Sequence, residues 1–432
     1  MAEPGDHVFD VLVVGGGPSG ASCAYWLAEA GWDVAVVEKK EFPREKTCGD
    51  GLTPRAVRQL ADMGVEDALT GAHKFRGLRS VAFGRSLELE WPEVPGFPTY
   101  GYTITRHDLD ALVCDRAAKA GATVLQGTEA LEPLAPEPAA GALAGCAGAL
   151  VAGKNNEARR EVRARYVVVA DGANSRFGRA LGTARDRDYP QGMALRGYYT
   201  SERHADPLIE SHLDIRDANG DVVPGYGWIF PLGDGRVNVG VGLLSTDQRW
   251  KGLNTSRLMD AFVTQAADAW GLSPETCCGP PTGGRLPMGM AVGPRTGANT
   301  IVVGDAGGLI NPFNGEGIAY GYETGRLGAS FVGEALAGGA AASIAAYEQR
   351  LKDAYGTYYR VGRAFVRLIS DPARMRLCVS TGMHSRAFMA QLMRIMANLM
   401  HPEAPGVAEV GYRGMVKVAA VLDRLERAGA SG

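Results

Sequence analysis

The sequence predicts an α/β fold in which a helix-flanked parallel sheet is interrupted by an antiparallel sheet and followed by a helical region. Three observations predict this class. Apolar strand patterns at 9–14, 165–170 and 299–303 are each followed by glycine or aspartate, as in buried parallel strands. Residues 9–38 fit one strand–loop–helix–strand unit. Residues 190–245 instead alternate short strands with turns, which indicates an inserted β-rich part.

The composition excludes several classes of protein. The chain has 432 residues, which suits about two or three domains. Its net charge of −3 gives no electrostatic basis for binding nucleic acid, so no nucleic-acid partner is expected. No apolar run reaches the roughly 18 residues of a spanning helix, and the acidic N-terminus does not resemble a signal peptide. We expect a cytoplasmic protein that is soluble or lies on a membrane surface.

The numbers of glycines and cysteines indicate which kinds of binding site to expect. The 59 glycines are about twice the usual share of roughly 7%. Because glycine suits backbone that turns sharply or approaches a ligand, we expect glycine clusters at binding sites. The seven cysteines are too sparse and irregular for a disulfide framework or a CxxC zinc site, and no metal site is expected.

The first strand–loop–helix–strand unit carries a nucleotide-binding pattern. Its helix is expected to end near Ala30, and the loop before it fits GxGxxG. The first glycine permits a tight turn, the second admits a pyrophosphate, and the third lets helix and strand pack closely. A carboxylate at the end of the second strand suits the ribose hydroxyls. The residues expected to contact a dinucleotide here are Gly15, Gly17, Pro18, Ser19, Gly20, Glu38 and Lys39.

Further elements follow along the chain. A helix is expected to begin near Thr53, capped by the hydroxyl of this residue, with Pro54 in its first turn. Residues 132–160 predict a loose hairpin or insertion, and the chain after Gly317 is expected to be helical to near residue 400. The other expected elements are strands and loops at 76–100, a helix at 106–120, and strands at 123–126, 225–231 and 236–244.

This order predicts three structural parts. A discontinuous, Rossmann-like domain is expected from residues 1–75, 101–185 and 286–340. A β-rich substrate domain is expected from 76–100 and 186–285, and a helical C-terminal region from 341–432.

Three further clusters reinforce the nucleotide-binding pattern. Asp-Gly at 171–172 and Gly-Asp at 304–305 each follow a buried strand, and Asn-Pro-Phe-Asn-Gly-Glu-Gly at 311–317 opens a helix. With the glycine loop, this set resembles the p-hydroxybenzoate hydroxylase superfamily of flavoproteins. More narrowly, it resembles the geranylgeranyl reductase family, through Pro-Arg-Glu-Lys-Thr-Cys-Gly-Asp-Gly-Leu-Thr-Pro at 43–54, Tyr-Gly-Trp-Ile-Phe-Pro at 226–231, and the 304–317 stretch.

The resemblance implies FAD rather than NAD as the resident cofactor. Asp305 would accept a hydrogen bond from a ribityl hydroxyl, and the helix opening at Gly317 would direct N–H groups at the flavin pyrimidine edge. Arg106 starts a helix where the superfamily has an arginine near the ribityl and phosphate region; the alternative is a surface salt bridge. Asp171 is expected to act indirectly, as a structural contact. The cofactor residues implied are Cys48, Gly49, Arg106, Asp171, Gly172, Gly304, Asp305, Gly315, Gly317 and Ile318.

Cys48 is a candidate for the reacting face of the site. In the resembled reductases, the Cys-Gly-Asp-Gly loop faces the flavin. A thiol there would relay a proton or form a transient disulfide, with Cys277 and Cys278 as candidate partners. The alternative is a small buried hydrophobic residue.

Three aromatic residues alternate along one expected strand. Tyr226, Trp228 and Phe230 have period two, so they project from one face, and Pro231 ends the strand. They line an elongated apolar slot or belong to ordinary core, and the match to the family motif YxWxFP favours the slot. The expected catalytic residues are Cys48, Tyr226 and Trp228, and the expected substrate pocket comprises Tyr226, Trp228, Phe230, Pro231 and Pro312.

Residues 361–401 suggest a membrane contact. They hold six arginines against one acid, Asp371, and six of the 13 methionines. Such a stretch suits an anionic membrane surface and an adaptable lipid channel; the alternative is packing helices with solvated arginines. We expect peripheral contact with the inner face of the cell membrane.

The resemblance implies an FAD-dependent reductase that saturates isolated C=C bonds of a polyprenyl chain. The substrate would be a prenyl diphosphate, a geranylgeranylated lipid, or the prenyl tail of a quinone such as menaquinone. With no second GxGxxG, the electron donor would be external, such as NAD(P)H or a reduced carrier protein. Two alternatives stay open: a flavin-dependent aromatic monooxygenase or halogenase, and a non-catalytic prenyl-binding protein. The YxWxFP motif differs from the WxWxIP of halogenases, and the intact FAD motifs argue against a non-catalytic role.

Overall fold

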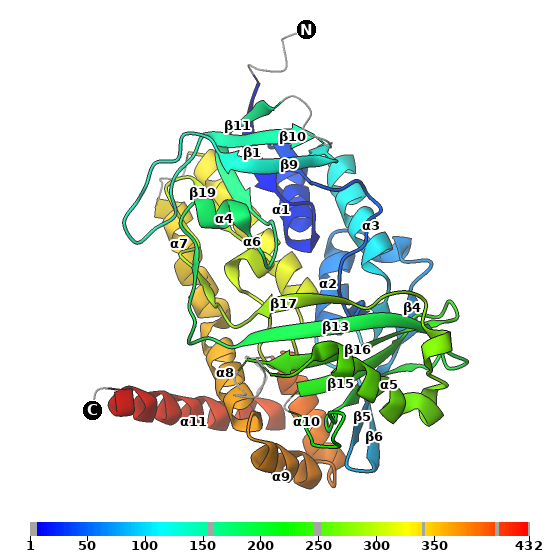
Figure 1. Ribbon diagram of the computed structural model, residues 1–432. Helices are drawn as coiled ribbons and strands as arrows, with labels where there is room; N and C mark the ends of the chain where they lie inside the picture. The colour runs from blue at the N-terminus through cyan, green and yellow to red at the C-terminus, as the bar shows by residue number, and fades with distance from the viewer. Residues whose placement is uncertain are drawn as a thin grey trace.

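The structure is a computed structural model that describes residues 7–153, 159–223, 225–245, 252–338, 342–401 and 406–430. Two seven-stranded sheets lie one above the other in Figure 1, and a helical region runs alongside the second. This arrangement confirms the predicted fold class of a parallel Rossmann-like sheet, an antiparallel sheet and C-terminal helices.

The first sheet is mainly parallel. Its strand order is β8–β2–β1–β11–β10–β9, and β19 pairs in parallel with β11. Only the pairings of β10 with its two neighbours are antiparallel, so the predicted hairpin at 132–160 is the edge of this sheet. Its strands are β1 (Val8–Val14), β2 (Val34–Val37), β8 (Thr123–Leu125), β9 (Thr128–Pro133), β10 (Gly148–Gly153), β11 (Arg160–Val169) and β19 (Thr300–Val302).

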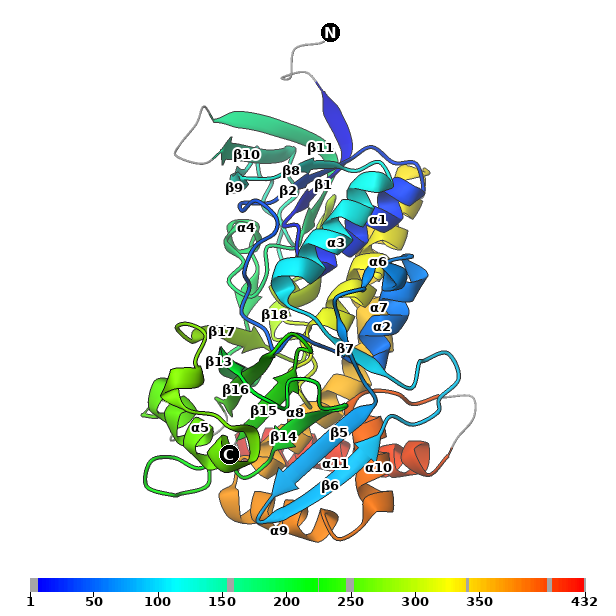
Figure 2. The ribbon, with the colours of Figure 1, turned by 90° about the vertical axis from the view of Figure 1, so that its right-hand side faces the viewer.

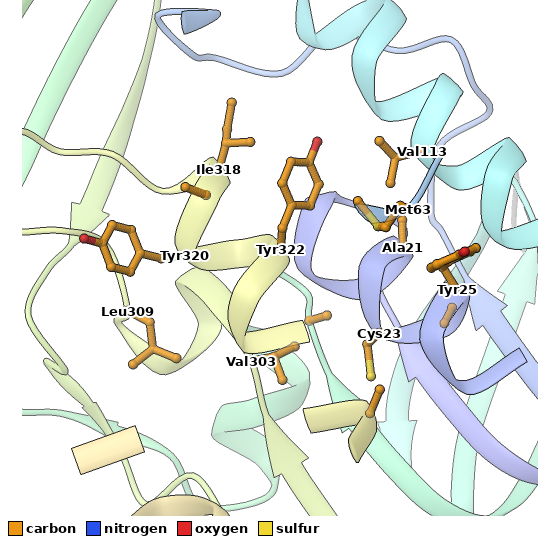
Figure 3. Packing of buried hydrophobic residues seen from close by; sticks show 14 of the residues in the cluster. Ala21, Cys23, Tyr25, Met63, Val113, Val303, Leu309, Ile318, Tyr320 and Tyr322 are labelled. Carbon is orange, nitrogen blue, oxygen red and sulfur yellow. The ribbon is translucent and has the colours of Figure 1, made fainter. Parts of the chain in front are cut away.

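Helices α1 (Pro18–Glu29), α3 (Arg106–Lys119) and α6 (Ile318–Leu336) cover one face of the first sheet. Figure 3 shows how their apolar faces meet: Tyr322 of α6 lies near Met63, Val113 and Ala21. These side chains are almost fully buried. The other face is covered by a second apolar cluster that includes Phe177 of α4 (Arg176–Ala180).

The second sheet is antiparallel except for the pairing of β14 with β5. Its order is β17–β13–β16–β15–β14–β5–β6. Helix α5 (Thr255–Trp270) packs on one face, where Phe262 fills the space above Gly227. The strands are β5 (Gly77–Ala82), β6 (Arg85–Glu90), β13 (Gln191–Thr200), β14 (Leu208–His212), β15 (Gly225–Pro231), β16 (Arg236–Leu244) and β17 (Thr282–Pro287).

Most of the C-terminal helices lie near the second sheet, whereas the first of them packs on α6. Figure 2 shows α9, α10 and α11 beneath this sheet, and α10 contacts β6. Met383, Met389 and Met393 join an apolar cluster with Phe75 and Trp91. The helices are α7 (Ala342–Leu351), a π-helical turn (Lys352–Gly356), α8 (Thr357–Ile369), α9 (Pro372–Gly382), α10 (Arg386–Met396) and α11 (Val407–Ala430).

Short elements connect the two sheets. A three-stranded sheet orders β3–β7–β4 beside helix α2. The remaining elements are α2 (Pro54–Asp62), β3 (Gly51–Leu52), β4 (His73–Phe75), β7 (Gly101–Thr103), β12 (Ala184–Arg185), β18 (Val292–Gly293), and 3-10 helices at Glu66–Ala68, Pro274–Thr276 and Gly304–Gly307.

One local prediction is wrong. Helix α2 does begin at Pro54, but the Thr53 side chain does not cap it. The hydroxyl instead donates a hydrogen bond to the carboxylate of Glu316, far along the chain. A hydrogen bond to a residue distant in the sequence therefore replaces the capping hydrogen bond expected within the helix. The predicted division of the chain into three parts stays a prediction.

Candidate active site

One large cavity runs from the glycine loop, past residues 44–53, to the aromatic face of β15 and on to the C-terminal helices. Its volume is about 1420 Å³, whereas a typical small-molecule pocket holds about 300–1,000 Å³. It therefore has room for a dinucleotide and a second, elongated ligand.

The glycine loop closes one end of the cavity. Gly15 has a φ of 108°, a conformation that favours glycine. A Cβ on Gly20 would overlap the carbonyl oxygen of Gly15, so the start of α1 can approach β1 only without a side chain there. Gly17 forms the N-cap of α1, with Pro18 in its first turn. The exposed N–H groups at this helix start suit a pyrophosphate.

Glu38 is held rigidly at the end of β2. Its carboxylate accepts hydrogen bonds from the Gly16 N–H at 3.0 Å and the Lys40 N–H at 3.1 Å. Arg44 lies 3.4 Å from the same carboxylate and 2.9 Å from Asp110. These contacts orient an acid toward the position expected for a ribose.

Arg106 lies at the start of α3 and lines the cavity. Its Nε and Nη2 donate to Asp110 at 2.6 and 2.7 Å. This ion pair is buried rather than on the surface, and the contact of Arg106 with FAD stays a prediction. Asp110 thus holds two guanidinium groups, of Arg106 and Arg44, beside the cavity.

Asp305 lies where a ribityl hydroxyl is expected. It lines the cavity, and burial raises the pKa of its carboxyl, while the positive charges of Lys46 and Arg106 act in the opposite direction. A Cβ on Gly317 would lie 3.1 Å from Asp305 Oδ1, and Gly317 is the N-cap of the 19-residue helix α6. The start of a long helix therefore faces the same region.

Three aromatic side chains line the next part of the cavity. The ring centroids of Tyr226 and Trp228 are 5.7 Å apart, and those of Trp228 and Phe230 are 6.3 Å apart. The Cys48 loop packs closely on them: a Cβ on Gly49 would lie 3.3 Å from Trp228 Nε1, and one on Gly51 would lie 3.0 Å from the Phe230 ring. The glycines of this loop bring its backbone against the aromatic row.

Asn238 joins this loop to the aromatic row. It is fully buried on β16. Its Oδ1 accepts from Trp228 Nε1 at 2.9 Å, and its Nδ2 donates to the Cys48 carbonyl at 2.9 Å and to Asp50 Oδ2 at 2.8 Å. Tyr198 donates to the same Asp50 oxygen at 2.6 Å. One amide therefore fixes the indole and the loop relative to each other.

Asp50 has a strained backbone and a shifted acidity. Its φ of 63° is unusual for a residue with a side chain. Burial raises the pKa of Asp50 to about 6, although the Tyr198 hydrogen bond, the Arg196 charge and the Asn238 hydrogen bond each lower it. The backbone N–H of Arg106 also donates to this carboxylate, at 3.3 Å.

Cys48 lines the cavity as a free thiol. Burial raises its pKa, and the Arg106 charge only partly offsets this. Cys277 and Cys278 are also free and do not line the cavity. The structure therefore does not bring the two candidate disulfide partners to Cys48.

Most of the predicted site residues share this cavity. Gly20 and Gly304 do not line it and act instead through close backbone packing. Pro231 does not line it either, and its carbonyl accepts a hydrogen bond from the Thr103 hydroxyl. Asp171 lines it, and its Oδ2 accepts from the Phe177 N–H at 3.1 Å, while the indirect role expected for this residue stays a prediction. The residues that do line it are Gly15, Gly17, Pro18, Ser19, Glu38, Lys39, Cys48, Gly49, Arg106, Asp171, Gly172, Tyr226, Trp228, Phe230, Asp305, Pro312, Gly315, Gly317 and Ile318.

The sequence interpretation missed several residues of the site. Arg44 and Glu316 lie inside the motifs at 43–54 and 311–317, so their position in these motifs could have identified them. Asn238 and Tyr198 lie in predicted strands with no motif of their own. The C-terminal helices add an apolar wall that includes Phe365, Met375, Val379, Phe388, Met389, Leu392, Met393, Met396, Val407 and Met415.

The residues present fit FAD. The oriented Glu38, the glycine cradle and Asp305 all line one cavity, and they supply the contacts that a ribose, a pyrophosphate and a ribityl chain would need. The FAD binding domain family matches residues 8–194.

Several known proteins resemble this chain over most of its length. The menaquinone reductase of Mycobacterium tuberculosis H37Rv is 39% identical over 433 residues, covering 97% of this chain and 98% of the relative. The menaquinone reductase of Mycolicibacterium smegmatis is 39% identical over 394 residues, or 91% and 92% of the two chains. Digeranylgeranylglycerophospholipid reductase 1 of Methanopyrus kandleri is 29% identical and covers 84% and 91%.

Solved structures share the fold. A geranylgeranyl bacteriochlorophyll reductase-like protein of Thermoplasma acidophilum matches with a TM-score of 0.72 and 25% identity, over 96% of this chain and 99% of that one. A flavin-dependent brominase matches with a TM-score of 0.71 at 18% identity, over 97% and 100%, which shows a shared fold alone. With close relatives along its whole length and the FAD-binding site in place, the chain belongs to the geranylgeranyl reductase family of FAD-dependent oxidoreductases.

Proposed function

We propose that this protein is an FAD-dependent reductase that saturates C=C bonds in the isoprenoid tail of a menaquinone. The observation that carries the proposal is the continuous cavity, which joins the FAD region to an aromatic row and then to an apolar, methionine-rich wall. A quinone tail is long, apolar and flexible, and methionines adapt to such ligands. The menaquinone reductases, at 39% identity, favour a quinone over the lipids of the 29% identical archaeal reductases.

Bound FAD, once reduced, would supply a hydride to one alkene carbon. Glu38, Asp305 and the glycine loop would hold the FAD. An isolated alkene is a poor electrophile, so a proton must add to the other carbon. The positive charge that then develops on the carbon that accepts the hydride needs stabilisation. The rings of Tyr226 and Trp228 offer electron-rich faces for this charge. Trp228 is buried, which would limit competition from water at the centre of the row.

The electron donor would come from outside the chain. We propose NAD(P)H or a reduced carrier protein, because residues 15–20 hold the single GxGxxG pattern of the sequence. We assign that pattern to FAD.

We also propose that the tail enters from a membrane surface. None of the helices in the described ranges is long and apolar enough to cross a bilayer. Leu368 and Phe388 line the cavity and are 42% and 55% exposed, so they lie at its mouth. Leu377 is 67% exposed on α9, which also carries the exposed Arg374 and Arg376. Apolar side chains beside arginines suit peripheral binding to an anionic leaflet, through residues 361–401.

The proposal is tested by product analysis without oxygen. The FAD-loaded protein is reduced with dithionite and mixed with a fully unsaturated menaquinone, and the lipid is examined by mass spectrometry. A gain of two hydrogens in the tail supports the proposal. An unchanged lipid beside flavin that stays reduced refutes it. Rapid oxygen consumption with an aromatic substrate would favour a monooxygenase, and purified protein with no affinity for FAD would favour a non-catalytic role.

A further inference from the structure

Glu316 is a half-buried carboxylic acid in the cavity wall, and the proposed reaction has given it no role so far. Its Oε1 accepts a hydrogen bond from the Thr53 hydroxyl. Its backbone N–H donates to Asn314 Oδ1 at 3.0 Å, and its carbonyl accepts from the Asn311 N–H at 2.9 Å. The side chain is therefore anchored on one oxygen, and the loop beneath it is fixed.

The other carboxyl oxygen, Oε2, is buried and has no hydrogen-bond partner among the described residues. A buried polar atom without a partner costs about 1–3 kcal/mol, and such atoms in native proteins call for an explanation. Glu316 lines the cavity, between Gly315 and Gly317, which line it as well. Among the described residues, this oxygen therefore has no protein donor, although its residue belongs to the cavity wall.

The surroundings of Glu316 favour its protonated form near neutral pH. Burial raises the pKa of Glu316 to about 7, and the negative charge of Glu323 acts in the same direction. The Thr53 hydrogen bond and the positive charge of Arg55 lower it. General acids work best when their pKa lies near the working pH.

The other proton carriers in this part of the cavity are less suited. Burial raises the pKa of the Cys48 thiol, and it raises that of the Tyr226 hydroxyl far above its usual range. The Tyr226 hydroxyl already donates to the Asn314 carbonyl at 2.8 Å. Both Asp50 oxygens already accept hydrogen bonds from protein donors.

Tyr226 links Glu316 to the aromatic row. The charges of Cys48 and of Glu316 both raise the pKa of Tyr226, as expected for groups that lie near one another. A Cβ on Gly315 would lie 3.5 Å from the Tyr226 hydroxyl oxygen. The acid therefore lies beside the row where we place the alkene.

We propose that the Glu316 carboxylic acid is the catalytic residue that protonates the alkene. This rests on the proposed function. The O–H bond of Glu316 breaks, and the π electrons of the alkene form a C–H bond to its proton. The other carbon accepts a hydride from the two-electron-reduced flavin, so the alkene gains two electrons and the flavin loses two. The Glu316 carboxylate takes a proton from water when the product leaves.

The test compares Glu316→Gln with Glu316→Asp and with a control, Glu334→Gln, on an exposed position of α6. Flavin content and thermal unfolding establish that each variant is folded and loaded. The pre-reduced proteins are then mixed with menaquinone without oxygen. Because the quinone ring can itself reoxidise the flavin, the rate at which the tail gains two hydrogens is followed by mass spectrometry from pH 5 to pH 9. We expect the Gln variant to lose about 100-fold or more in rate, within the range for removal of a general acid. Wild type should slow as pH rises through about 7, the Asp variant should keep a pH dependence, and the control should match wild type.

A second readout does not depend on activity. Infrared difference spectra of the flavin-free protein should show a protonated carboxyl band that disappears as pH rises through about 7. The band should be missing in Glu316→Gln and present in the control. If wild type saturates the tail and Glu316→Gln keeps the same rate and pH profile, the Glu316 proposal alone is overturned. A wild type that never reduces the lipid overturns the proposed function and this step with it.

Discussion

Replacing Asn238 with leucine removes three hydrogen bonds while keeping a side chain of similar size. The amide contacts the Trp228 indole, the Cys48 carbonyl and the Asp50 carboxylate, and it is fully buried. Leucine can replace none of these contacts. The variant therefore tests whether this single side chain holds the Cys48 loop against the aromatic row.

The expected loss in the free energy of unfolding follows from the polar groups that the substitution leaves without a hydrogen-bond partner. The Trp228 N–H and the Cys48 carbonyl each lose the partner that Asn238 provides. At about 1–3 kcal/mol for each orphaned group, the free energy of unfolding should fall by about 2–6 kcal/mol. Asp50 keeps its hydrogen bonds from Tyr198 and from the Arg106 N–H, so it adds little. Affinity for FAD should fall as well, because the loop lines the cavity.

Urea unfolding followed by tryptophan fluorescence measures the stability, and flavin fluorescence on titration measures the affinity. Asn219→Leu, in an exposed turn, is the matched control and should stay within about 0.5 kcal/mol of wild type. A loss below about 1 kcal/mol in Asn238→Leu, with unchanged FAD affinity, would refute the reasoning. It would mean that water or a shifted side chain satisfies both groups.

Three further predictions concern other parts of the molecule. Gly20→Ala should abolish FAD binding, because the added methyl group overlaps the Gly15 carbonyl oxygen, and dialysis followed by flavin absorbance checks this. Glu316→Gln should gain stability relative to wild type as pH rises from 4.5 to about 7. The folded state raises the pKa of Glu316, so the contribution of this residue to the stability of wild type is fully present below the unfolded pKa and is lost at higher pH. In urea unfolding, the relative gain in stability of the Gln variant should reach at most about 3 kcal/mol. A stability difference that does not change with pH contradicts this prediction. Leu377→Glu, at an exposed position that does not line the cavity, should reduce sedimentation with vesicles of anionic lipid, with reduction of detergent-dispersed menaquinone retained. Unchanged sedimentation would place the membrane contact elsewhere.

The dinucleotide end of the site could be predicted because its signals are local. The glycine loop and Glu38 lie within one unit of the chain, and their spacing alone dictates where they meet. The period-two pattern of Tyr226, Trp228 and Phe230 likewise determines a shared face. The structure places all of these along one cavity.

The rest depended on contacts between distant segments. Asn238 lies in a predicted strand, but its partners at 48 and 50 are 190 and 188 residues away. Thr53 looked like a helix cap because its partner, Glu316, is 263 residues away. The helical pattern of 361–401 predicted its secondary structure, but periodicity does not say against which sheet a helix packs. The burial that raises the pKa of Glu316 arises only when these segments meet.

The central claim is that this cavity presents an isoprenoid tail to reduced FAD. The most direct measurement is a single turnover without oxygen, in which reduced, FAD-loaded protein meets an equimolar amount of unsaturated menaquinone. We predict that the flavin becomes oxidised and that the tail gains two hydrogens, in equal amounts. Flavin that stays reduced beside an unchanged tail would contradict the account.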